Sequence, residues 1–414
     1  MIATQEYDVL IAGAGPAGAH TALRLARLGW RVALVDAQTF PRKKPCGEFL
    51  SPACLPFLEE LDLLSDVLAA GAAEVDGMHL VTSRSRASGR FTPMGRYTSS
   101  HGHGLGIRRE VLDTLAVERA ACDPNIRVMM GWRVRGVLQD DTGRARGLTV
   151  VDPDGHQATL HGRFVVGADG PRSRVARGAG LALPRTGPAR FALVARFRDV
   201  AERQRAHVHF LGRDYVAACP IDDGLFTANL VVDADQLPKG AHALEAFLRE
   251  HLRRDDSLGQ LLADAPLAEP IASCGPLGTR TRRPFGPGVA LVGDACGFVD
   301  PLTGEGMFFA MRGASLLAPA IDECLRDPRR EAQALGRYAR ARRFEFGPRY
   351  AMARLLQRGL RRPGIPERVI GALDRAPGLC DLVLGLTGDY VPPSGLASPG
   401  VWRSAFGAGA RART

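Results

Sequence analysis

The chain has 414 residues, of which 45% are hydrophobic and 24% are charged, and its formal net charge at pH 7 is +10. This length is more than one ordinary hydrophobic core organises, so we expect two domains or one domain with large insertions. The sequence contains no apolar run of about 18 residues, the length that a membrane-spanning helix needs. It also begins without a charged-then-apolar leader, so no signal peptide is predicted.

The positive charge comes almost entirely from arginine, because the only lysines are Lys43, Lys44 and Lys239. Such a bias can reflect genome composition and does not by itself indicate a partner. Aromatic residues make up 6% of the chain and no nucleic-acid-binding module is recognisable, so no nucleic acid partner is predicted. The eight cysteines show no paired metal-ligand spacing, which fits a reduced, cytoplasmic protein.

The first element is an apolar strand at 9–12, followed by a glycine-rich turn and a helical stretch at 19–28. In that turn Gly13 permits the change of direction, Gly15 lets the backbone approach a pyrophosphate, and Gly18 lets helix and strand pack closely. The next strand, at 31–35, ends at an aspartate whose carboxylate can accept both ribose hydroxyls of an adenosine. We therefore predict a dinucleotide site at Gly13, Gly15, Pro16, Ala17, Gly18 and Asp36.

The segment after this unit is rich in proline and glycine over residues 40–48, which predicts a loop. A second glycine motif, Val165-Val166-Gly167-Ala168-Asp169-Gly170, follows a short apolar strand. The elements expected between the two are a broken helical hairpin at 50–70, strands of a second sheet at 75–98, a helix at 109–121, a strand at 128–134 and a β-hairpin at 147–160.

Residues 186–281 differ in texture, since short alternating runs predict a mainly antiparallel sheet with one helix at 243–253. A third glycine motif, Ala290-Leu291-Val292-Gly293-Asp294-Ala295, comes next, and a helix is expected at 304–317. Residues 329–362 hold eleven arginines and predict a basic helical stretch. We expect Pro348 and Pro363 to break it.

Together, the three motifs in this order resemble those of the FAD-dependent monooxygenases and reductases related to p-hydroxybenzoate hydroxylase. The resemblance covers roughly residues 5–325. It implies an α/β fold, with a Rossmann-like FAD-binding domain, an inserted mainly antiparallel β-sheet substrate domain and a C-terminal helical segment. The boundaries we expect are 1–74, 100–185 and 282–325 for the FAD-binding domain, 75–99 and 186–281 for the substrate domain, 326–402 for the helical segment and 403–414 for a disordered tail.

Two segments look most like the geranylgeranyl reductase-like branch of this superfamily. From Gly293 the chain reads Gly-Asp-Ala-Cys-Gly-Phe-Val-Asp-Pro-Leu-Thr-Gly-Glu-Gly-Met, without the histidine and asparagine of aromatic hydroxylases. Pro41-Arg42-Lys43-Lys44-Pro45-Cys46-Gly47 is similar to the reductase segment whose cysteine lies near the flavin ring. The Trp-x-Trp motif and the Phe-Ser pair of the related halogenases are missing.

The resemblance implies a role in FAD binding for residues of all three motifs. It places Arg109, which begins an Arg-x-x-x-Asp helix start with Asp113, near the cofactor, and Asp294 at the ribityl chain. From the residues alone, a surface helix pair is the alternative for Arg109 and Asp113, and a helix cap is the alternative for Asp294. The implied set is Gly13, Gly15, Pro16, Ala17, Gly18, Asp36, Arg42, Cys46, Gly47, Arg109, Asp169, Gly170, Gly293, Asp294, Pro301, Gly304 and Gly306.

Two departures from the branch lie where the resemblance places the substrate. Where reductases carry Tyr-x-Trp-x-Phe-Pro, this chain reads Tyr215-Val216-Ala217-Ala218-Cys219-Pro220, and Glu48 follows Gly47 where many reductases have a second glycine. We therefore expect Glu48, Tyr215 and Pro220 to border the substrate pocket, and a polyprenyl substrate does not follow from the sequence.

The function that we predict is an FAD-dependent oxidoreductase that uses NAD(P)H to reduce a lipophilic isoprenoid, quinone or polyketide-like molecule. No second dinucleotide motif is present, so NAD(P)H is expected to bind transiently in the substrate groove. A monooxygenase that hydroxylates or epoxidises such a molecule is the alternative within enzymes. A flavin-binding partner without turnover is an alternative of another class.

Cys46 is the predicted catalytic residue, because a thiol beside the flavin could donate a proton and Lys43 or Lys44 could lower its pKa. A cysteine that merely packs in the loop is the alternative. The basic helical stretch could dock on an anionic membrane, which would place the protein at its periphery, or could be a solvated face. His101 and His103 lack a third ligand nearby, so no metal site is predicted.

Overall fold

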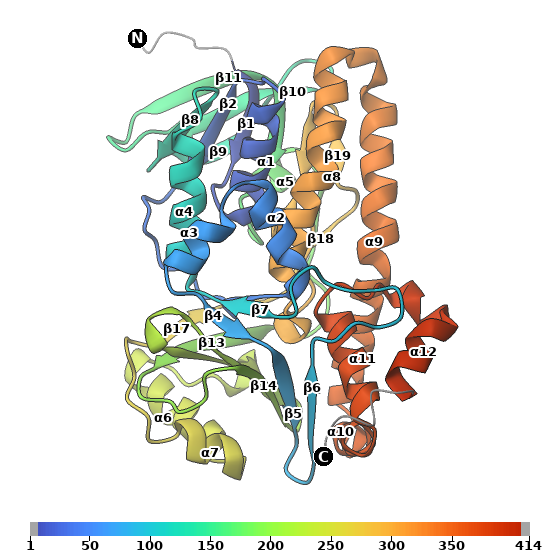
Figure 1. The fold of residues 1–414 in the computed structure, drawn as a ribbon. Helices are drawn as coiled ribbons and strands as arrows, with labels where there is room; N and C mark the ends of the chain where they lie inside the picture. The colour runs from blue at the N-terminus through green and yellow to red at the C-terminus, as the bar shows by residue number, and fades with distance from the viewer. Residues whose placement is uncertain (1–6, 407–414) are drawn as a thin grey trace.

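The computed structural model describes residues 7–406 (Figure 1). A mainly parallel sheet forms the centre of one half of the molecule. Its strand order is β19-β20-β11-β1-β2-β8, and β10 and β9 extend it from β11. The inner strands are apolar and buried on both faces, as expected for a sheet covered by helices. The strands are β1 (Tyr7–Ala12), β2 (Val32–Asp36), β8 (Ile126–Met130), β9 (Arg133–Gln139), β10 (Ala145–Val151), β11 (Gln157–Gly167), β19 (Phe285–Gly286) and β20 (Val289–Leu291).

Helices pack on this sheet and bury a large apolar core. α1 contacts both α4 and α8, and the apolar faces of these helices share one cluster with residues of β1 and β2. The helix expected at 304–317 begins two residues later and runs to Arg326. The helices of this half are α1 (Pro16–Arg27), α2 (Leu55–Glu60), α3 (Leu64–Ala69), α4 (Arg109–Ala121), α5 (Arg174–Gly178) and α8 (Gly306–Arg326).

A second sheet lies below the first in Figure 1, with strand order β17-β13-β16-β15-β14-β5-β6. All its neighbours pair antiparallel except β14 and β5, so the predicted mainly antiparallel sheet is confirmed. Helices α6 (Ala241–Leu252) and α7 (Asp256–Leu262) pack on its outer face. Its strands are β5 (Gly77–Val81), β6 (Arg86–Arg90), β13 (Arg190–Phe197), β14 (Arg205–Leu211), β15 (Asp214–Pro220), β16 (Phe226–Asp233) and β17 (Ala272–Cys274).

Smaller elements connect the two sheets. Strand β7 pairs with both β3 and β4 in a three-stranded sheet, and β12 pairs with β18. These short strands connect the two large sheets. The boundaries between the FAD-binding domain and the substrate domain stay a prediction. The strands are β3 (Phe49–Leu50), β4 (Ala73–Val75), β7 (Gly104–Gly106), β12 (Ala182–Leu183) and β18 (Arg280–Thr281).

The C-terminal segment is helical and lies beside both halves of the molecule (Figure 1). Its long helix α9 packs along α8, while α10 and α11 contact β6 of the second sheet. None of the helices within residues 7–406 is long and apolar enough to cross a membrane. The helices are α9 (Glu331–Leu360), α10 (Ile365–Arg375), α11 (Pro377–Thr387) and α12 (Pro399–Phe406).

Two expectations for this segment are corrected. Pro348 lies inside α9 and does not break it. Proline removes one hydrogen bond, to the carbonyl of Phe344, and Phe344 lies on the exposed side of the helix where water can replace that bond. The predicted disordered tail is also wrong for its first four residues, since α12 continues to Phe406. The rest of that tail, 407–414, lies outside the described residues.

Candidate functional site

The first glycine motif joins β1 to α1 and leaves no room for side chains at two of its glycines. Gly13 has φ +99°, and a Cβ added there would lie 2.4 Å from the carbonyl oxygen of Ala168. A Cβ at Gly18 would lie 1.8 Å from the carbonyl oxygen of Gly13. The turn and the close packing that the motif predicts are therefore present, and both depend on the missing side chain.

Gly15 differs, because what surrounds it is a pair of guanidinium groups. A Cβ there would lie 3.5 Å from Nη2 of Arg42 and 3.7 Å from Nη2 of Arg109. The N-terminus of α1, which begins at Pro16, points its free amides to the same place. An open glycine between two cations and a helix N-terminus fits the diphosphate of FAD, the cofactor that the sequence implies.

Asp36 at the end of β2 is fixed in orientation by backbone amides. Its Oδ2 accepts the N–H of Ala14 at 2.8 Å, and its Oδ1 accepts the N–H of Gln38 at 2.9 Å. Arg42 lies 3.9 Å from the same carboxylate. The aspartate thus lies beside the group formed by Gly15, Arg42, Arg109 and the start of α1, called the diphosphate cradle below. Its contact with a ribose stays a prediction.

Arg109 forms a buried pair with Asp113 at the start of α4. Nε donates to Oδ1 at 2.8 Å and Nη2 to Oδ2 at 2.7 Å, and both side chains are buried. Arg42 approaches the same carboxylate at 3.5 Å. Burial opposes the charge of Arg109, but Asp113 and the nearby thiol of Cys46 raise its pKa above the ordinary value. The alternative of an exposed helix pair is therefore wrong, and Asp113 holds both cations of the cradle.

Lys44 belongs to this group as well, although the sequence analysis did not place it there. Burial lowers its pKa, and so does Arg109, while Asp294 opposes the shift. Asp294 lies in the third glycine motif, where burial raises its pKa and Lys44 and Arg109 lower it. A signal existed in the sequence, because two of the three lysines of this arginine-rich chain are adjacent in the 40–48 loop.

The second motif follows β11 and includes an acceptor atom without a partner. Oδ2 of Asp169 accepts the N–H of Arg174 at 2.6 Å and of Val175 at 3.2 Å, whereas its buried Oδ1 has no partner among the described residues. Burial raises the pKa of Asp169, against the hydrogen bonds from Ser173 and these amides. Gly170 beside it has φ +75° and faces Lys44. The free oxygen and the nearby cation make this turn polar toward the site.

The third motif is brought directly against the first. Gly293 has φ +60°, and a Cβ there would lie 2.8 Å from Cβ of Ala17. Pro301 begins a short 3-10 turn that ends at Gly304, which has φ +71°. α8 then begins at Gly306, where an added Cβ would meet nothing within 4 Å. The open amides at this helix start can face negative charge on a cofactor.

Glu305, between those two glycines, is held by the C-terminal helices. Arg349 of α9 reaches Oε1 of Glu305 at 3.1 Å and Oδ1 of Asp389 at 2.9 Å, and all three side chains are buried. Ser51 donates to Asp389 at 2.7 Å, and Thr303 to Glu305 at 2.6 Å. One arginine of the predicted basic face is therefore an internal ion-pair partner of the third motif.

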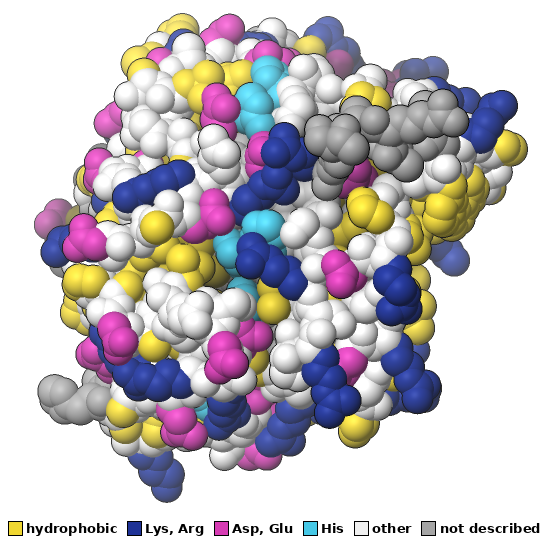
Figure 2. Space-filling view, turned by 60° about the horizontal axis from the view of Figure 1, so that its bottom comes forward, with side chains coloured by type: hydrophobic (Ala, Val, Ile, Leu, Met, Phe, Trp, Pro, Cys, Tyr) yellow, Lys and Arg dark blue, Asp and Glu magenta, His cyan; other side chains and the backbone are white. Residues whose placement is uncertain are grey.

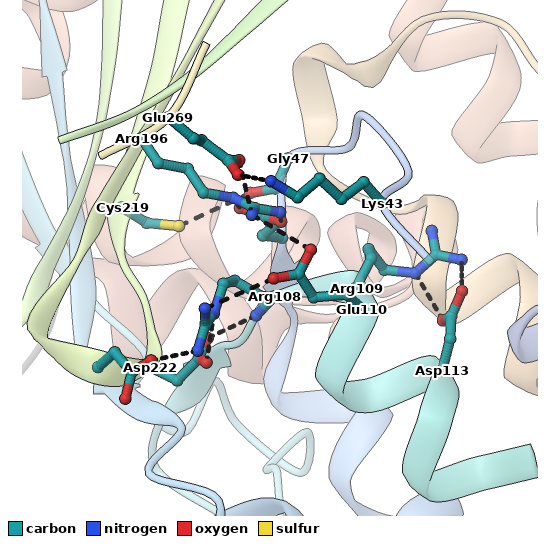
Figure 3. Close-up of polar contacts among 12 residues, drawn as sticks. Lys43, Gly47, Arg108, Arg109, Glu110, Asp113, Arg196, Cys219, Asp222 and Glu269 are labelled. Carbon is teal, nitrogen blue, oxygen red and sulfur yellow. Dashed lines mark hydrogen bonds and ion pairs between the residues drawn. The ribbon is translucent and has the colours of Figure 1, made fainter. Parts of the chain in front are cut away.

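Cys46 is half-buried, and the cation beside it is Arg109, whereas Lys43 or Lys44 was expected there. Its thiol lies beside Arg109 and helps to raise the pKa of that arginine. Lys43 instead pairs with Glu269 (Figure 3). The charges that act most on Lys44 are those of Arg109 and Asp294. The geometry therefore corrects the expectation that Lys43 supports the thiol and assigns that position to Arg109.

A charged cluster lies where the loop meets the second sheet (Figure 3). Arg196 of β13 binds Glu48 through Nε at 3.2 Å and Glu269 through Nη1 at 2.8 Å, and it lies 3.5 Å from Glu110. Glu48 is buried with φ +58°, and burial raises its pKa while Arg196 lowers it. A cavity of about 240 Å³ opens beside this cluster, lined by Lys43, Lys44, Pro45, Val194, Arg196, Glu269, Pro270 and Ala272.

None of the predicted pocket residues, Glu48, Tyr215 and Pro220, lines this cavity. Glu48 approaches it only through Arg196. Tyr215 is buried and donates to Asp300 at 2.5 Å, and Pro220 ends β15 with its carbonyl against Gly106. Sequence reasoning missed Arg196 and Glu269, because single charged residues in an alternating strand and a loop carry no motif.

Comparison with known proteins gives one family and several relatives. A family model described as "FAD binding domain" matches residues 6–346. Digeranylgeranylglycerophospholipid reductase 2 of Methanopyrus kandleri is 28% identical over 84% of this chain and 85% of its own length. Menaquinone reductase of Mycobacterium tuberculosis is 27% identical over 76% of each chain. The structure of PqsL, "a probable FAD-dependent monooxygenase" of Pseudomonas aeruginosa, is 26% identical with a TM-score of 0.72 over 89% of this chain and all of that one.

Proposed function

This chain belongs to the FAD binding domain family and is an FAD-dependent enzyme; from that premise we propose that it reduces a carbon–carbon double bond of a lipophilic isoprenoid or quinone. A polyketide-like molecule of similar polarity is included in this substrate class. NAD(P)H is the proposed electron donor. The observation that supports reduction most is the position of Cys46, which directly follows the cavity-lining residues 43–45 and lies beside Arg109.

The relatives support the substrate class. The two reductases named above act, by their names, on a lipid with geranylgeranyl chains and on an isoprenoid quinone. They align with 84% and 76% of this chain. A lipophilic substrate also fits the apolar part of the cavity wall, which Pro45, Val194, Pro270 and Ala272 form.

Each group of site residues has a part in holding FAD. Arg42, Arg109 and the amides at the start of α1 would bind the diphosphate, and Asp36 the adenosine ribose. Asp294 would take the ribityl chain, with Lys44 beside it. The amides that begin α8 at Gly306 would face the ring and stabilise negative charge there. When bound, FAD supplies the hydride-transfer chemistry.

The protein must then supply a proton. Reduction of a double bond adds a hydride to one carbon and a proton to the other, so a donor is needed at the second carbon. Cys46 can give that proton from its thiol, and the Arg109 guanidinium lies beside it. The thiolate regains its proton from solvent, since Cys46 is only half-buried.

NAD(P)H has no dedicated site in this proposal. The sequence holds a single Rossmann-type glycine motif at its start, and that motif is taken by FAD. The phosphates of a nicotinamide dinucleotide would bind Lys43 and Arg196 of the cavity wall for one turnover, in place of the ion pairs that both form with Glu269. Donor and substrate would then use the cavity in succession.

A membrane contact would bring such a substrate to the enzyme. Several large apolar side chains are exposed on α9 and α12, with Phe344 81%, Leu355 67% and Phe406 61% exposed. Exposed arginines alternate with them, a combination suited to an anionic lipid surface. Not every arginine contributes, because Arg349 is buried. The exposed residues of α9 that make up this surface, called the basic face below, are Arg340, Arg343, Phe344, Arg354, Leu355, Leu356 and Arg358.

Monooxygenation is the second candidate, and the similarity to PqsL favours it. One anaerobic experiment separates the two. FAD-bound enzyme is reduced with NADPH or NADH without oxygen and then mixed with menaquinone or a geranylgeranyl lipid. Reoxidation of the flavin with a product two hydrogens heavier supports reduction. Turnover only after oxygen is admitted, with a product one oxygen heavier, would replace the proposal by monooxygenation.

A further inference from the structure

Two histidines and one glutamate, side chains of the kinds that bind metals in other proteins, meet on the second sheet, outside the site described above. His79 of β5 and His207 of β14 are direct register partners in neighbouring parallel strands. Glu202 lies in the loop just before β14. One ligand atom from each of the three residues lies within 4.8 Å of the others. Figure 2 shows histidine side chains grouped in the middle of this face, with an acidic and several basic side chains beside them.

The cluster faces away from the flavin site. His207 pairs with Ala218 of β15, and the next residue, Cys219, points to the opposite face and donates to the carbonyl of Gly47. His209, on the same face as His207, binds Asp255 at the start of α7 at 3.1 Å. The three residues therefore lie on the α7 side of the sheet, and they take no part in the chemistry proposed above.

Neighbouring groups already orient two of the three ligands. Oε1 of Glu202 accepts the backbone N–H groups of Arg203, Gln204 and Arg205, each at 3.0 Å. Its other oxygen is thereby turned to Nε2 of His207, at 3.4 Å. Nδ1 of His79 forms a hydrogen bond with Ser88 at 2.7 Å, which fixes that ring and leaves its other nitrogen free. Such outer hydrogen bonds are typical of metal-binding histidines and carboxylates.

We propose that His79, Glu202 and His207 bind one divalent transition metal ion of the zinc type. Two imidazoles and one carboxylate are a ligand set that zinc accepts, with water in the fourth position of the tetrahedron. The ion would link β14 to the β5–β6 hairpin through side chains of both strands. Its role would be to stabilise this part of the second sheet.

The charges around the cluster are compatible with an ion. Burial lowers the pKa of His79 to about 4, helped by His207, Arg86 and Arg205, so the ring is neutral at pH 7. Burial also lowers the pKa of His207, against Glu202. Of the two nearby arginines, Arg205 is paired with Asp76 at 2.8 Å, which offsets its charge.

The test is zinc binding to the purified FAD-bound enzyme, measured by competition with a chromophoric chelator. The wild type should take up one zinc ion per chain and gain thermal stability. Loss of an outer hydrogen-bond partner lowers metal affinity roughly 10–100-fold, and loss of a ligand should cost at least as much. His79→Ala should therefore bind zinc at least that much more weakly and should lose the gain in thermal stability. Glu202→Gln should behave in the same way, and Ser88→Ala should show a smaller loss.

Two controls make the result specific. His156→Ala alters a second group of possible ligands, Asp152, Asp154 and His156, which lies in an exposed turn, and it should keep the wild-type affinity. All variants keep the eight cysteines, so binding that differs among them cannot arise from thiols. FAD absorbance and circular dichroism verify the fold of each variant. No zinc uptake by the wild type, or equal affinity in His79→Ala and Glu202→Gln, would overturn the proposal.

Discussion

Tyr215 donates its hydroxyl hydrogen to Oδ1 of Asp300 at 2.5 Å, and this bond joins the second sheet to the loop that leads into α8. Arg190 binds the other carboxylate oxygen at 3.3 Å and lies over the tyrosine ring. Burial and Asp300 raise the pKa of Tyr215 well above its ordinary value, so the phenol stays protonated and remains the donor. The tyrosine retained from the reductase motif therefore holds the third glycine motif against the sheet.

Loss of this hydroxyl should weaken the junction. We expect Tyr215→Phe to lower the free energy of unfolding by about 1.5–3 kcal/mol, the range for a hydrogen bond to a charged group. Denaturant unfolding of the FAD-bound protein measures the change. Tyr97→Phe, at a tyrosine whose hydroxyl has a hydrogen bond only from the adjacent Arg96 among the described residues, should stay within about 0.5 kcal/mol of wild type. Equal stability of the two variants would show that the bond to Asp300 contributes nothing.

The diphosphate cradle is tested at Gly15. Gly15→Val should place methyl groups between Arg42 and Arg109, where the diphosphate is expected, and the purified protein should lack the visible absorbance of flavin. Gly102→Val is the matched control, because an added Cβ at Gly102 meets nothing within 4 Å. Normal FAD content in Gly15→Val would move the cofactor away from the first motif.

Cys46→Ser tests the proton donor. The variant should keep FAD and its reduction by NAD(P)H, while the half-reaction with substrate slows roughly 10²-fold, the lower range for loss of a general acid. Stopped-flow absorbance of the flavin follows both half-reactions separately. Cys122→Ser, at an exposed cysteine, is the control and should match wild type. An unchanged substrate half-reaction in Cys46→Ser removes this thiol from the mechanism.

His20 should make the free energy of unfolding of the FAD-binding domain fall in acid. It lies in α1, is buried, and has no described partner at Nδ1. Burial lowers its pKa from 6.5 to about 3, helped by Arg24. Because the folded pKa is depressed, the neutral ring stabilises the fold fully above pH 6.5, and this stability is lost as the pH falls toward 3.

The measurement compares the free energy of unfolding at pH 7 and pH 5. Wild type should lose about 2 kcal/mol more than His20→Leu over this interval, at roughly 1.4 kcal/mol for each pH unit below 6.5. The variant can differ from wild type at pH 7 through packing, so only the change with pH counts. Parallel pH profiles of the two proteins would contradict the prediction.

The basic face should bind membranes through charge and apolar side chains together. Binding to vesicles should require anionic lipid and weaken with added salt, since exposed charges are screened within about 8–10 Å at physiological ionic strength. Phe344→Ser with Leu355→Ser should weaken binding in cosedimentation. Leu68→Ser, at an exposed leucine of α3, should not. Equal binding to neutral and anionic vesicles, or none, would leave the basic face merely solvated.

The glycine motifs could be located from the sequence because their constraint is local. A strand, a positive-φ turn and a helix start lie within a few residues, so Gly13, Gly15 and Gly18 report a geometry that their own neighbours create. The antiparallel sheet was similarly visible in the alternation of residues 186–281. Both signals depend on backbone periodicity and require no knowledge of distant partners.

The rest of the site depends on partners far apart in the sequence. Tyr215 could not be assigned to Asp300, which lies 85 residues away and on a different element. Arg196 and Glu269 carry no motif, and the cation beside Cys46 was taken from its sequence neighbours although Arg109 comes from another element. The prediction that Pro348 breaks the helix failed because the cost of a proline inside a helix depends on whether the carbonyl that it frees faces water. Whether that carbonyl faces water depends in turn on how the helix packs against the rest of the molecule.

Arg349 sets a lower limit on the length of chain that can work as a unit. The family model ends at residue 346, three positions before this arginine, and Asp389 lies further along still. A chain cut at that point would leave Glu305 buried in the third motif without its cation, at a cost of several kcal/mol for an unpaired buried charge. Truncation for crystallisation or expression should therefore fall after Asp389, which lies just beyond the end of α11. Any rearrangement of the C-terminal helices, for example on a membrane, would change the ion pair between Arg349 and Glu305, which lies beside the start of α8.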